Sequence, residues 1–134
     1  MKQKYLLDTH IWLWSQLEPD RLSPKVIEAL DDESAELHLS PLSVWEAITL
    51  ARKGRVDLGA DPAAWTDRAL KTAPVRQALL TLEIGRTSGV MTRPPRDPVD
   101  RFLVASASVL GLCLITADEE ILAVAECQLL SNRG

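Results

Sequence analysis

The chain has 134 residues and a formal net charge of −4, from 15 basic and 19 acidic side chains. This length suits one domain, residues 1–134, and 46% hydrophobic residues can build its core without disulfides. The acidic total argues against a protein that simply coats nucleic acid, and no apolar run reaches the roughly 18 residues of a membrane span. An acid interrupts the N-terminal segment before a signal peptide can form, so we expect a cytoplasmic protein.

Short apolar runs alternate with segments of helical periodicity in the first half of the chain. Two of the helices are marked by a capping residue followed by proline, at Ser23-Pro24 and Asp61-Pro62, because these residues suit the N-cap and the first turn. The predicted elements up to residue 72 are strands over 5–7 and 36–40 and helices over 9–17, 24–32, 41–52 and 62–72.

The second half continues the alternation. Residues 91–98 contain three prolines and are predicted to be irregular. The predicted elements are helices over 77–88 and 98–110, a strand over 112–116, a short helix after Asp118 and an edge strand over 128–130. At least two strands are continuously apolar, which is typical of strands buried on both sides. The pattern predicts a single α/β domain with a central parallel sheet of about four to five strands and helices on both faces.

Four acids lie where the predicted topology brings elements together. Asp8 ends the first strand, and Asp118 follows the strand over 112–116 by two residues. Glu46 lies in the second turn of the helix after the second strand, and Asp100 lies in the first turn of the helix before the last apolar strand. Because parallel strands end at the same edge of a sheet, we expect these acids to converge there.

Two interpretations of these acids remain open. Asp8, Asp97 and Asp118 stand at N-cap positions, and Asp97 and Asp100 have the spacing of a capping box, so helix capping at about 1 kcal/mol per cap could explain them. Alternatively, clustered carboxylates repel one another, and a Mg²⁺ or Mn²⁺ ion, which prefers oxygen ligands, removes that cost. Glu46 favours metal binding, because it lies past the first turn of an apolar segment.

Several short motifs follow one another along the chain in a specific order. They are Leu6-Leu7-Asp8-Thr9-His10, Ser40-Pro41-Leu42-Ser43-Val44-Trp45-Glu46, Lys53-Gly54-Arg55, Asp61-Pro62-Ala63-Ala64-Trp65, Asp97-Pro98-Val99-Asp100-Arg101 and Ile115-Thr116-Ala117-Asp118. With this set the chain resembles, over nearly its whole length, the PIN-domain ribonucleases, in particular the VapC-type toxins of bacterial type II toxin–antitoxin pairs. Pro95 is a departure, because related sequences often carry His before the Arg-Asp-Pro stretch.

The resemblance implies a Mg²⁺-dependent endoribonuclease, with Mn²⁺ as a substitute ion, that is neutralised by a cognate antitoxin and forms a homodimer. It implies that the catalytic, metal-binding carboxylates are Asp8, Glu46, Asp100 and Asp118. It also implies supporting residues around them, namely Thr9, Ser43, Asp97 and Thr116. Asp97 is expected either to support the site or only to cap its helix.

An RNA substrate needs positive contacts, and residues 49–101 supply them with 10 basic and 6 acidic side chains. The arginines beside the acids are the predicted RNA-binding residues: Arg93, Arg96 and Arg101.

The aromatic residues and histidines are expected to act mainly in packing. Trp14 and Trp45 are predicted in the core, whereas Trp12 and Trp65 lie on helices that, by the resemblance, could line a dimer or antitoxin groove. His10 and His38 are given a structural role.

Two other functions are weighed against the nuclease. A catalytically silent PIN-fold binding module would not need all four acids. A haloacid-dehalogenase-like phosphatase would need a second Asp two residues after Asp8, where His10 stands, and a Lys near the last acidic motif. With 6 glycines and no cluster of them, a P-loop or dinucleotide fingerprint is excluded.

Overall fold

Five parallel strands form the centre of the fold in a computed structural model that describes residues 2–92, 94–124 and 126–133. The strands are β1 (Lys4–Leu7), β2 (Glu36–Leu39), β3 (Arg76–Gln77), β4 (Cys113–Thr116) and β5 (Leu129–Ser131). Their order across the sheet is β3-β2-β1-β4-β5, and each neighbouring pair is parallel. The predicted parallel sheet and the edge position of the last strand are therefore confirmed.

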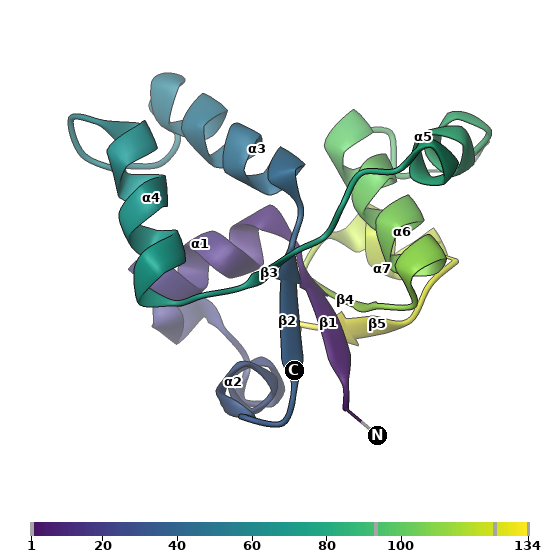
Figure 1. Ribbon diagram of the computed structural model, residues 1–134, viewed down its shortest axis with the longest axis horizontal. Helices are drawn as coiled ribbons and strands as arrows, with labels where there is room; N and C mark the ends of the chain where they lie inside the picture. The colour runs from purple at the N-terminus through teal and green to yellow at the C-terminus, as the bar shows by residue number, and fades with distance from the viewer. Residues whose placement is uncertain (1, 93, 125, 134) are drawn as a thin grey trace.

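The helices cover both faces of the sheet, as predicted. They are α1 (Thr9–Leu17), the 3₁₀ turn η1 (Pro19–Arg21), α2 (Pro24–Asp31), α3 (Pro41–Arg52), α4 (Pro62–Thr72), α5 (Leu82–Gly89), α6 (Pro98–Leu110) and α7 (Glu119–Val124). Figure 1 shows α1 to α4 on one side of the sheet and α5 to α7 on the other. Within the described residues, no helix has the length and apolar character needed to cross a membrane.

The alternation of side chains along β1 explains the two layers. Leu6 points to the α6 side, where it packs in one apolar cluster with Leu103 and Leu114. Leu7 points to the opposite side and packs in a second cluster with Ile11 and Val26. Because the strand is buried on both faces, its sequence is a continuous apolar run, and its carboxyl end is held rigidly between the layers.

The capping signals fix where the helices begin. The Ser23 side chain accepts a hydrogen bond from the Val26 N–H at 3.4 Å, and the Asp61 side chain accepts one from the Ala64 N–H at 3.1 Å. Each cap is followed by proline at the first position of its helix. The predicted starts of α2 and α4 are confirmed.

The predicted helix over 77–88 is wrong in its first part. Gln77 belongs to β3, and the next residue, Ala78, extends the ladder because its N–H donates to the Leu39 carbonyl at 2.9 Å. The helix α5 begins only at Leu82, where the Thr81 hydroxyl accepts a hydrogen bond from the Ile84 N–H at 3.1 Å. A strand of two residues is too short to show an alternating pattern, so helical spacing alone was misleading here.

Candidate active site

The carboxyl ends of β1 and β4 open into a cavity of about 370 Å³ that is lined mainly by acids. Its lining residues are Asp8, His10, Trp14, Glu46, Asp97, Asp100, Ala117 and Asp118. The structure thus brings the four predicted catalytic carboxylates to one place, from the residue after β1, from α3, from α6 and from the turn after β4. No lysine or arginine among the described residues lines this carboxylate cavity.

Asp8 is held by side-chain chemistry rather than by helix capping. It stands at the N-cap of α1, yet within the described chain its side chain makes no capping hydrogen bond. Instead the Thr116 hydroxyl donates to Asp8 Oδ2 at 2.6 Å, and the same hydroxyl oxygen accepts from the Asp118 N–H at 3.0 Å. Asp8 is only 6% exposed. Thr116 therefore links the ends of β1 and β4 and orients the buried carboxylate.

Capping does account for part of the acid cluster. Asp97 Oδ1 accepts from the Val99 N–H at 2.8 Å and from the Asp100 N–H at 3.4 Å, at the start of α6. Asp118 Oδ1 accepts from the Ile121 N–H at 3.0 Å, at the start of α7. Both residues also line the cavity, so capping fixes where these carboxylates stand without removing them from the site.

A buried pair of hydroxyls places Glu46. The Thr9 hydroxyl donates to the Ser43 hydroxyl at 2.9 Å, and neither residue is exposed. This bond joins the first turn of α1 to the first turn of α3. Glu46 lies one turn further along α3. The bond between Thr9 and Ser43 therefore fixes α3, and with it Glu46, next to Asp8.

Burial and mutual repulsion raise the pKa values of three of these acids. Burial is the largest cause for Asp8, and the hydrogen bond from Thr116 opposes it. Burial also raises the pKa of Glu46, with the charges of Asp8 and Asp97 adding to the shift. For Asp100, burial and the charges of four neighbouring acids raise the pKa to about 8. The cavity therefore disfavours four ionised carboxylates unless positive charge is supplied.

The donor set fits a hard divalent cation, since carboxylate oxygens are the ligands that Mg²⁺ and Mn²⁺ prefer. Among the described residues, no group of three or more His, Cys, Asp or Glu side chains already stands in an arrangement that would hold a metal ion. The five acids nevertheless line one cavity, so carboxylate oxygens for such an ion are available at a single place.

Sequence reasoning missed both aromatic rings of this cavity, those of His10 and Trp14, and misplaced Trp45. His10, two residues after Asp8 in the first turn of α1, lines the cavity, and its place directly after Asp8-Thr9 was the available signal. Trp14 packs partly against the core and also lines the cavity. Trp45 was predicted in the core but is 58% exposed, because it lies on the face of α3 that turns away from the apolar layer. Trp12 lies on a helix that was expected to line a groove, and although it is only 1% exposed it lines the cavity of about 480 Å³ on the opposite side of α1.

The predicted RNA-binding arginines differ in their placement. Arg93 lies outside the described residues. The side chain of Arg96 is 88% exposed, and its Nε lies 3.7 Å from Glu120 Oε1 on α7. The Arg101 guanidinium donates to the carbonyls of Pro95, Ser88 and Met91. This arrangement favours a role for Arg101 in holding the end of α5 and the following loop against α6.

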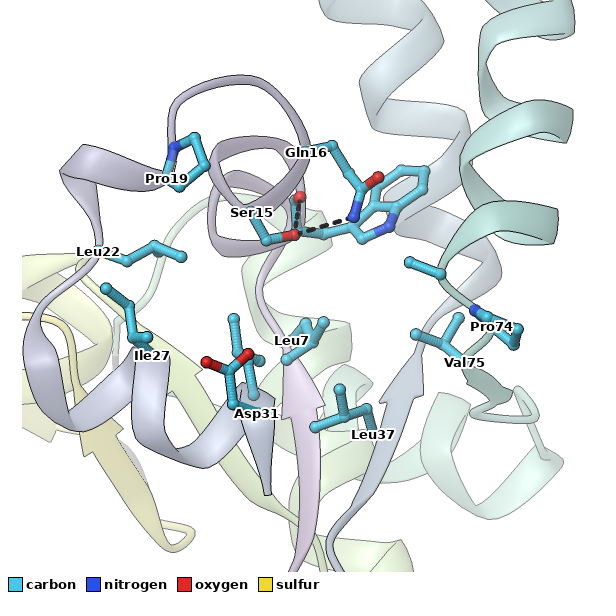
Figure 2. A pocket seen from close by; sticks show the side chains of 13 residues that line it. Leu7, Ser15, Gln16, Pro19, Leu22, Ile27, Asp31, Leu37, Pro74 and Val75 are labelled. Atoms are coloured by element: carbon cyan, nitrogen blue, oxygen red, sulfur yellow. Dashed lines mark hydrogen bonds between the residues drawn. The ribbon is translucent and has the colours of Figure 1, made fainter. Parts of the chain in front are cut away.

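A larger cavity of about 480 Å³ lies on the opposite side of α1, between α1, α2 and the segment before β3 (Figure 2). Residues of α1 that face it, such as Ser15 and Gln16, are on the other side of the helix from His10 and Trp14. Its walls are mostly apolar, and Asp31 is its one acid among the described residues. The smaller carboxylate cavity is therefore the better candidate for catalysis.

Comparison with known proteins agrees with this geometry. The family model described as the PIN domain matches residues 5–126. Ribonuclease VapC22 from Mycobacterium tuberculosis is 30% identical over 117 residues, which cover 87% of this chain and 88% of the relative.

Solved structures show the same fold at lower identity. The VapBC2 structure from Rickettsia felis, bound to a promoter DNA fragment, has a TM-score of 0.70 at 14% identity, covering 96% of this chain and 98% of the other. VapBC-1 from nontypeable Haemophilus influenzae has a TM-score of 0.67 at 20% identity, covering 98% of this chain and 100% of the other. The family-model match and the identity to a VapC ribonuclease show that this chain belongs to the PIN-domain family and is of the VapC type.

Proposed function

We propose that the protein is a metal-dependent endoribonuclease toxin that hydrolyses RNA phosphodiester bonds in the carboxylate cavity. The observation that carries this proposal is the convergence of Asp8, Glu46, Asp100 and Asp118 on one cavity at the carboxyl edge of the sheet. A related protein that is 30% identical is a ribonuclease, which supports the substrate class. The rise of the Asp100 pKa to about 8 supports the need for a cation.

Some residues of the carboxylate cavity would bind the ion, and others keep the ligands of the ion oriented. Asp8 and Asp100 would hold Mg²⁺ or Mn²⁺, with Glu46 or Asp118 adjoining. When bound, the ion supplies a lowered pKa for water and positive charge beside the phosphoryl oxygens. Thr116 keeps one oxygen of Asp8 engaged, which fixes the plane of that carboxylate. Water would then attack phosphorus, the bond to the leaving oxygen of the RNA would break, and a proton from that water would pass to the leaving oxygen.

We further propose that the protein acts in the cytoplasm and is neutralised by a cognate antitoxin. Solved structures with the same fold are VapBC complexes, which supports a protein partner of this kind. Exposed apolar side chains on α5 and on the segment before it support a homodimer, because such patches on small proteins mark interaction surfaces.

The direct test is cleavage of small structured RNAs with Mg²⁺, with Mn²⁺ and with EDTA. We expect cleavage with either ion and none with EDTA. Asp8→Asn should lower the cleavage rate by about a hundredfold or more, since even outer partners of metal ligands are worth up to about that much. Asp67→Asn, an exposed acid on α4, is the matched control and should cleave as the wild type does.

Two outcomes would count against the proposal. Metal-dependent cleavage at the wild-type rate by Asp8→Asn would overturn the assignment of the site. A wild-type protein that binds RNA but never cleaves it would favour the silent binding module instead.

A further inference from the structure

A third cavity, of about 350 Å³, adjoins the carboxylate cavity and has a different chemical character. His10 and Trp14 line both cavities, so these two rings form the wall between them. The new cavity, here called the Trp14 cavity, is completed by η1 and by the end of α3, through residues that include Arg21, Leu50 and Arg55. A chain of nucleotides seated in the carboxylate cavity would therefore reach the Trp14 cavity next.

Three flat groups form one wall of the Trp14 cavity: the Arg21 guanidinium lies over the Trp14 ring, and the His10 ring is tilted against that ring. The Arg21 guanidinium carbon lies 4.4 Å from the centroid of the Trp14 ring. The His10 ring lies 5.8 Å from Trp14, centroid to centroid, at an interplanar angle of 53°. Nucleobases that have left a duplex stack on aromatic rings and on guanidinium planes. Leu50 adds an apolar surface, so the cavity offers what the faces of a base require.

The turn after α3 directs a second cation into the same cavity. Gly54 has φ +73°, a left-handed conformation that glycine adopts without strain. Its N–H donates to the Ala51 carbonyl at 3.1 Å, and the Arg55 N–H donates to the Leu50 carbonyl at 2.9 Å. These two bonds are those of a Schellman motif, which reverses the chain over the last turn of the helix. The motif therefore brings Arg55 back beside Leu50, and both residues line the Trp14 cavity.

The charges of the Trp14 cavity suit a phosphate. Arg21 forms an exposed ion pair with Glu18, with Nη1 and Oε2 3.4 Å apart. Arg55 has no ion pair with any residue that the structure describes, so its charge remains available. The Trp14 cavity thus carries net positive charge, whereas the cavity on the other side of His10 and Trp14 is acidic.

We propose that the Trp14 cavity binds one nucleotide of single-stranded RNA next to the bond that is cleaved. The base stacks on the surface formed by Trp14 and Arg21, and Arg55 contacts the phosphate. This inference rests on the proposed function, because it places the cleaved bond in the carboxylate cavity. It assigns a role to the Lys53-Gly54-Arg55 motif that the catalytic carboxylates do not explain.

The test is RNA binding in EDTA, where cleavage cannot occur. The probe is a fluorescently labelled, unstructured ten-nucleotide RNA, and fluorescence anisotropy gives Kd over a range of salt concentrations. Trp14→Leu should weaken binding about tenfold, within the range measured for loss of one stacked base, and Trp14→Phe should retain most of the affinity. Arg55→Ala should lower the slope of log K against log salt by about 0.7, the value for one phosphate contact on a single strand.

The control is Arg52→Ala, which removes an equal charge from the last turn of α3 at a residue that does not line the cavity. It should leave the salt slope unchanged. Circular dichroism and urea unfolding establish that each variant is folded. Equal Kd values and slopes for Arg52→Ala, Arg55→Ala and the wild type, with a folded Trp14→Leu that binds normally, would overturn the inference.

Cleavage assays separate this inference from the proposed function. If RNA is cleaved, Arg55→Ala and Trp14→Leu should raise KM for RNA more than they lower kcat. Cleavage that is normal in both variants would leave the nuclease standing and remove the nucleotide site. If the wild type binds RNA without cleaving it, the proposed nuclease fails, while the anisotropy comparison still decides what the Trp14 cavity binds. A wild-type protein that binds no RNA would overturn both.

Discussion

Thr116 shows how one hydroxyl opposes the effect of burial on the pKa of an acid. Its hydrogen is donated to Asp8, and its oxygen accepts from the backbone of Asp118, so the direction of both bonds is fixed. Burial raises the pKa of Asp8, and this donated hydrogen bond lowers it. The Thr116 side chain therefore favours the ionised form of Asp8, which is the form that a cation would bind.

Asp100 is an acid whose negative charge destabilises the folded protein. An ordinary aspartate has a pKa of 3.8, and in the folded protein burial and neighbouring acids raise that of Asp100 to about 8. The folded state thus binds the proton more tightly than the unfolded chain. The stabilisation of the folded state by this bound proton is complete below pH 4 and is lost as the pH rises through 8.

We expect Asp100→Asn to stabilise the metal-free protein at pH 8 and to have little effect at pH 4. The gain in the free energy of unfolding at pH 8 should be at least about 1.4 kcal/mol, the equivalent of one pKa unit. Urea unfolding in EDTA at both pH values measures it, with Asp67→Asn as the exposed control. A gain of equal size at both pH values would show that repulsion in the carboxylate cavity is not its cause.

At the scale of the elements, the start of α6 depends on Asp97, which has two roles. Asp97 caps the helix with two hydrogen bonds and also lines the carboxylate cavity. We expect Asp97→Ala to lower the free energy of unfolding by about 1 kcal/mol, the usual value of a cap. Asp97→Asn should preserve stability, because asparagine caps about as well as aspartate.

Cleavage by the asparagine variant then separates the two roles of Asp97. We expect it to cleave RNA nearly as the wild type does, since the cap positions Asp100 and is retained. A large loss of cleavage in a variant of unchanged stability would show instead that the Asp97 charge belongs to the catalytic set. The paired measurements are urea unfolding and the Mn²⁺-dependent cleavage rate.

The sequence predicted best those elements that carry their own boundary signals. Helices that begin with a cap and a proline were placed to within a residue or two, and so were the strands of the buried centre. The failures occurred where tertiary contacts decide. The strand β3 exists because Ala78 and its neighbours pair with β2, and no local pattern marks that pairing. Similarly, the exposure of Trp45 depends on how α3 rests on the sheet, which its composition does not reveal.

Much of the candidate site was predictable, because parallel topology itself brings strand ends together. The placement of Asp8 and Asp118 follows from that rule. What could not be predicted were the contacts that position the acids, such as the hydroxyl pair of Thr9 and Ser43. His10 was also missed, since the direction of a histidine two residues after an acid is known only once the helix is placed.

For the whole molecule, the charge and the apolar surface lie in different places. The basic residues concentrate in the middle of the chain, while the carboxylate cavity is built from acids drawn from both ends and the centre. An acidic total is therefore compatible with an RNA substrate, provided that a cation offsets the cavity. Four of the seven large apolar side chains that are exposed among the described residues lie on α5 or within three residues of its ends, and these four make up a third region: Leu79, Leu80, Leu82 and Val90.

This third region carries the prediction of a homodimer. Leu82 is 96% exposed, Leu79 is 60% exposed and Val90 is 62% exposed, so these side chains make few contacts within their own chain. In a two-fold dimer each substitution acts twice, because the same patch lies on both subunits. Burying one leucine stabilises the dimer by at least about 1.5 kcal/mol, and the dimer buries two copies of Leu82. Leu82→Glu should therefore weaken dimerisation by at least about a hundredfold.

Sedimentation equilibrium of the wild type and of Leu82→Glu at micromolar concentrations measures the effect. Ile27→Glu, on α2, is the control, since it adds the same charge to a different exposed apolar residue. A wild type that is monomeric throughout, or a Leu82→Glu variant that dimerises as tightly as the wild type, would contradict this interface. Because Leu82 packs against almost nothing in its own chain, a monomeric variant should keep the wild-type free energy of unfolding after dimerisation is accounted for. The rate at which this monomeric variant cleaves RNA would then show whether cleavage needs one subunit or two.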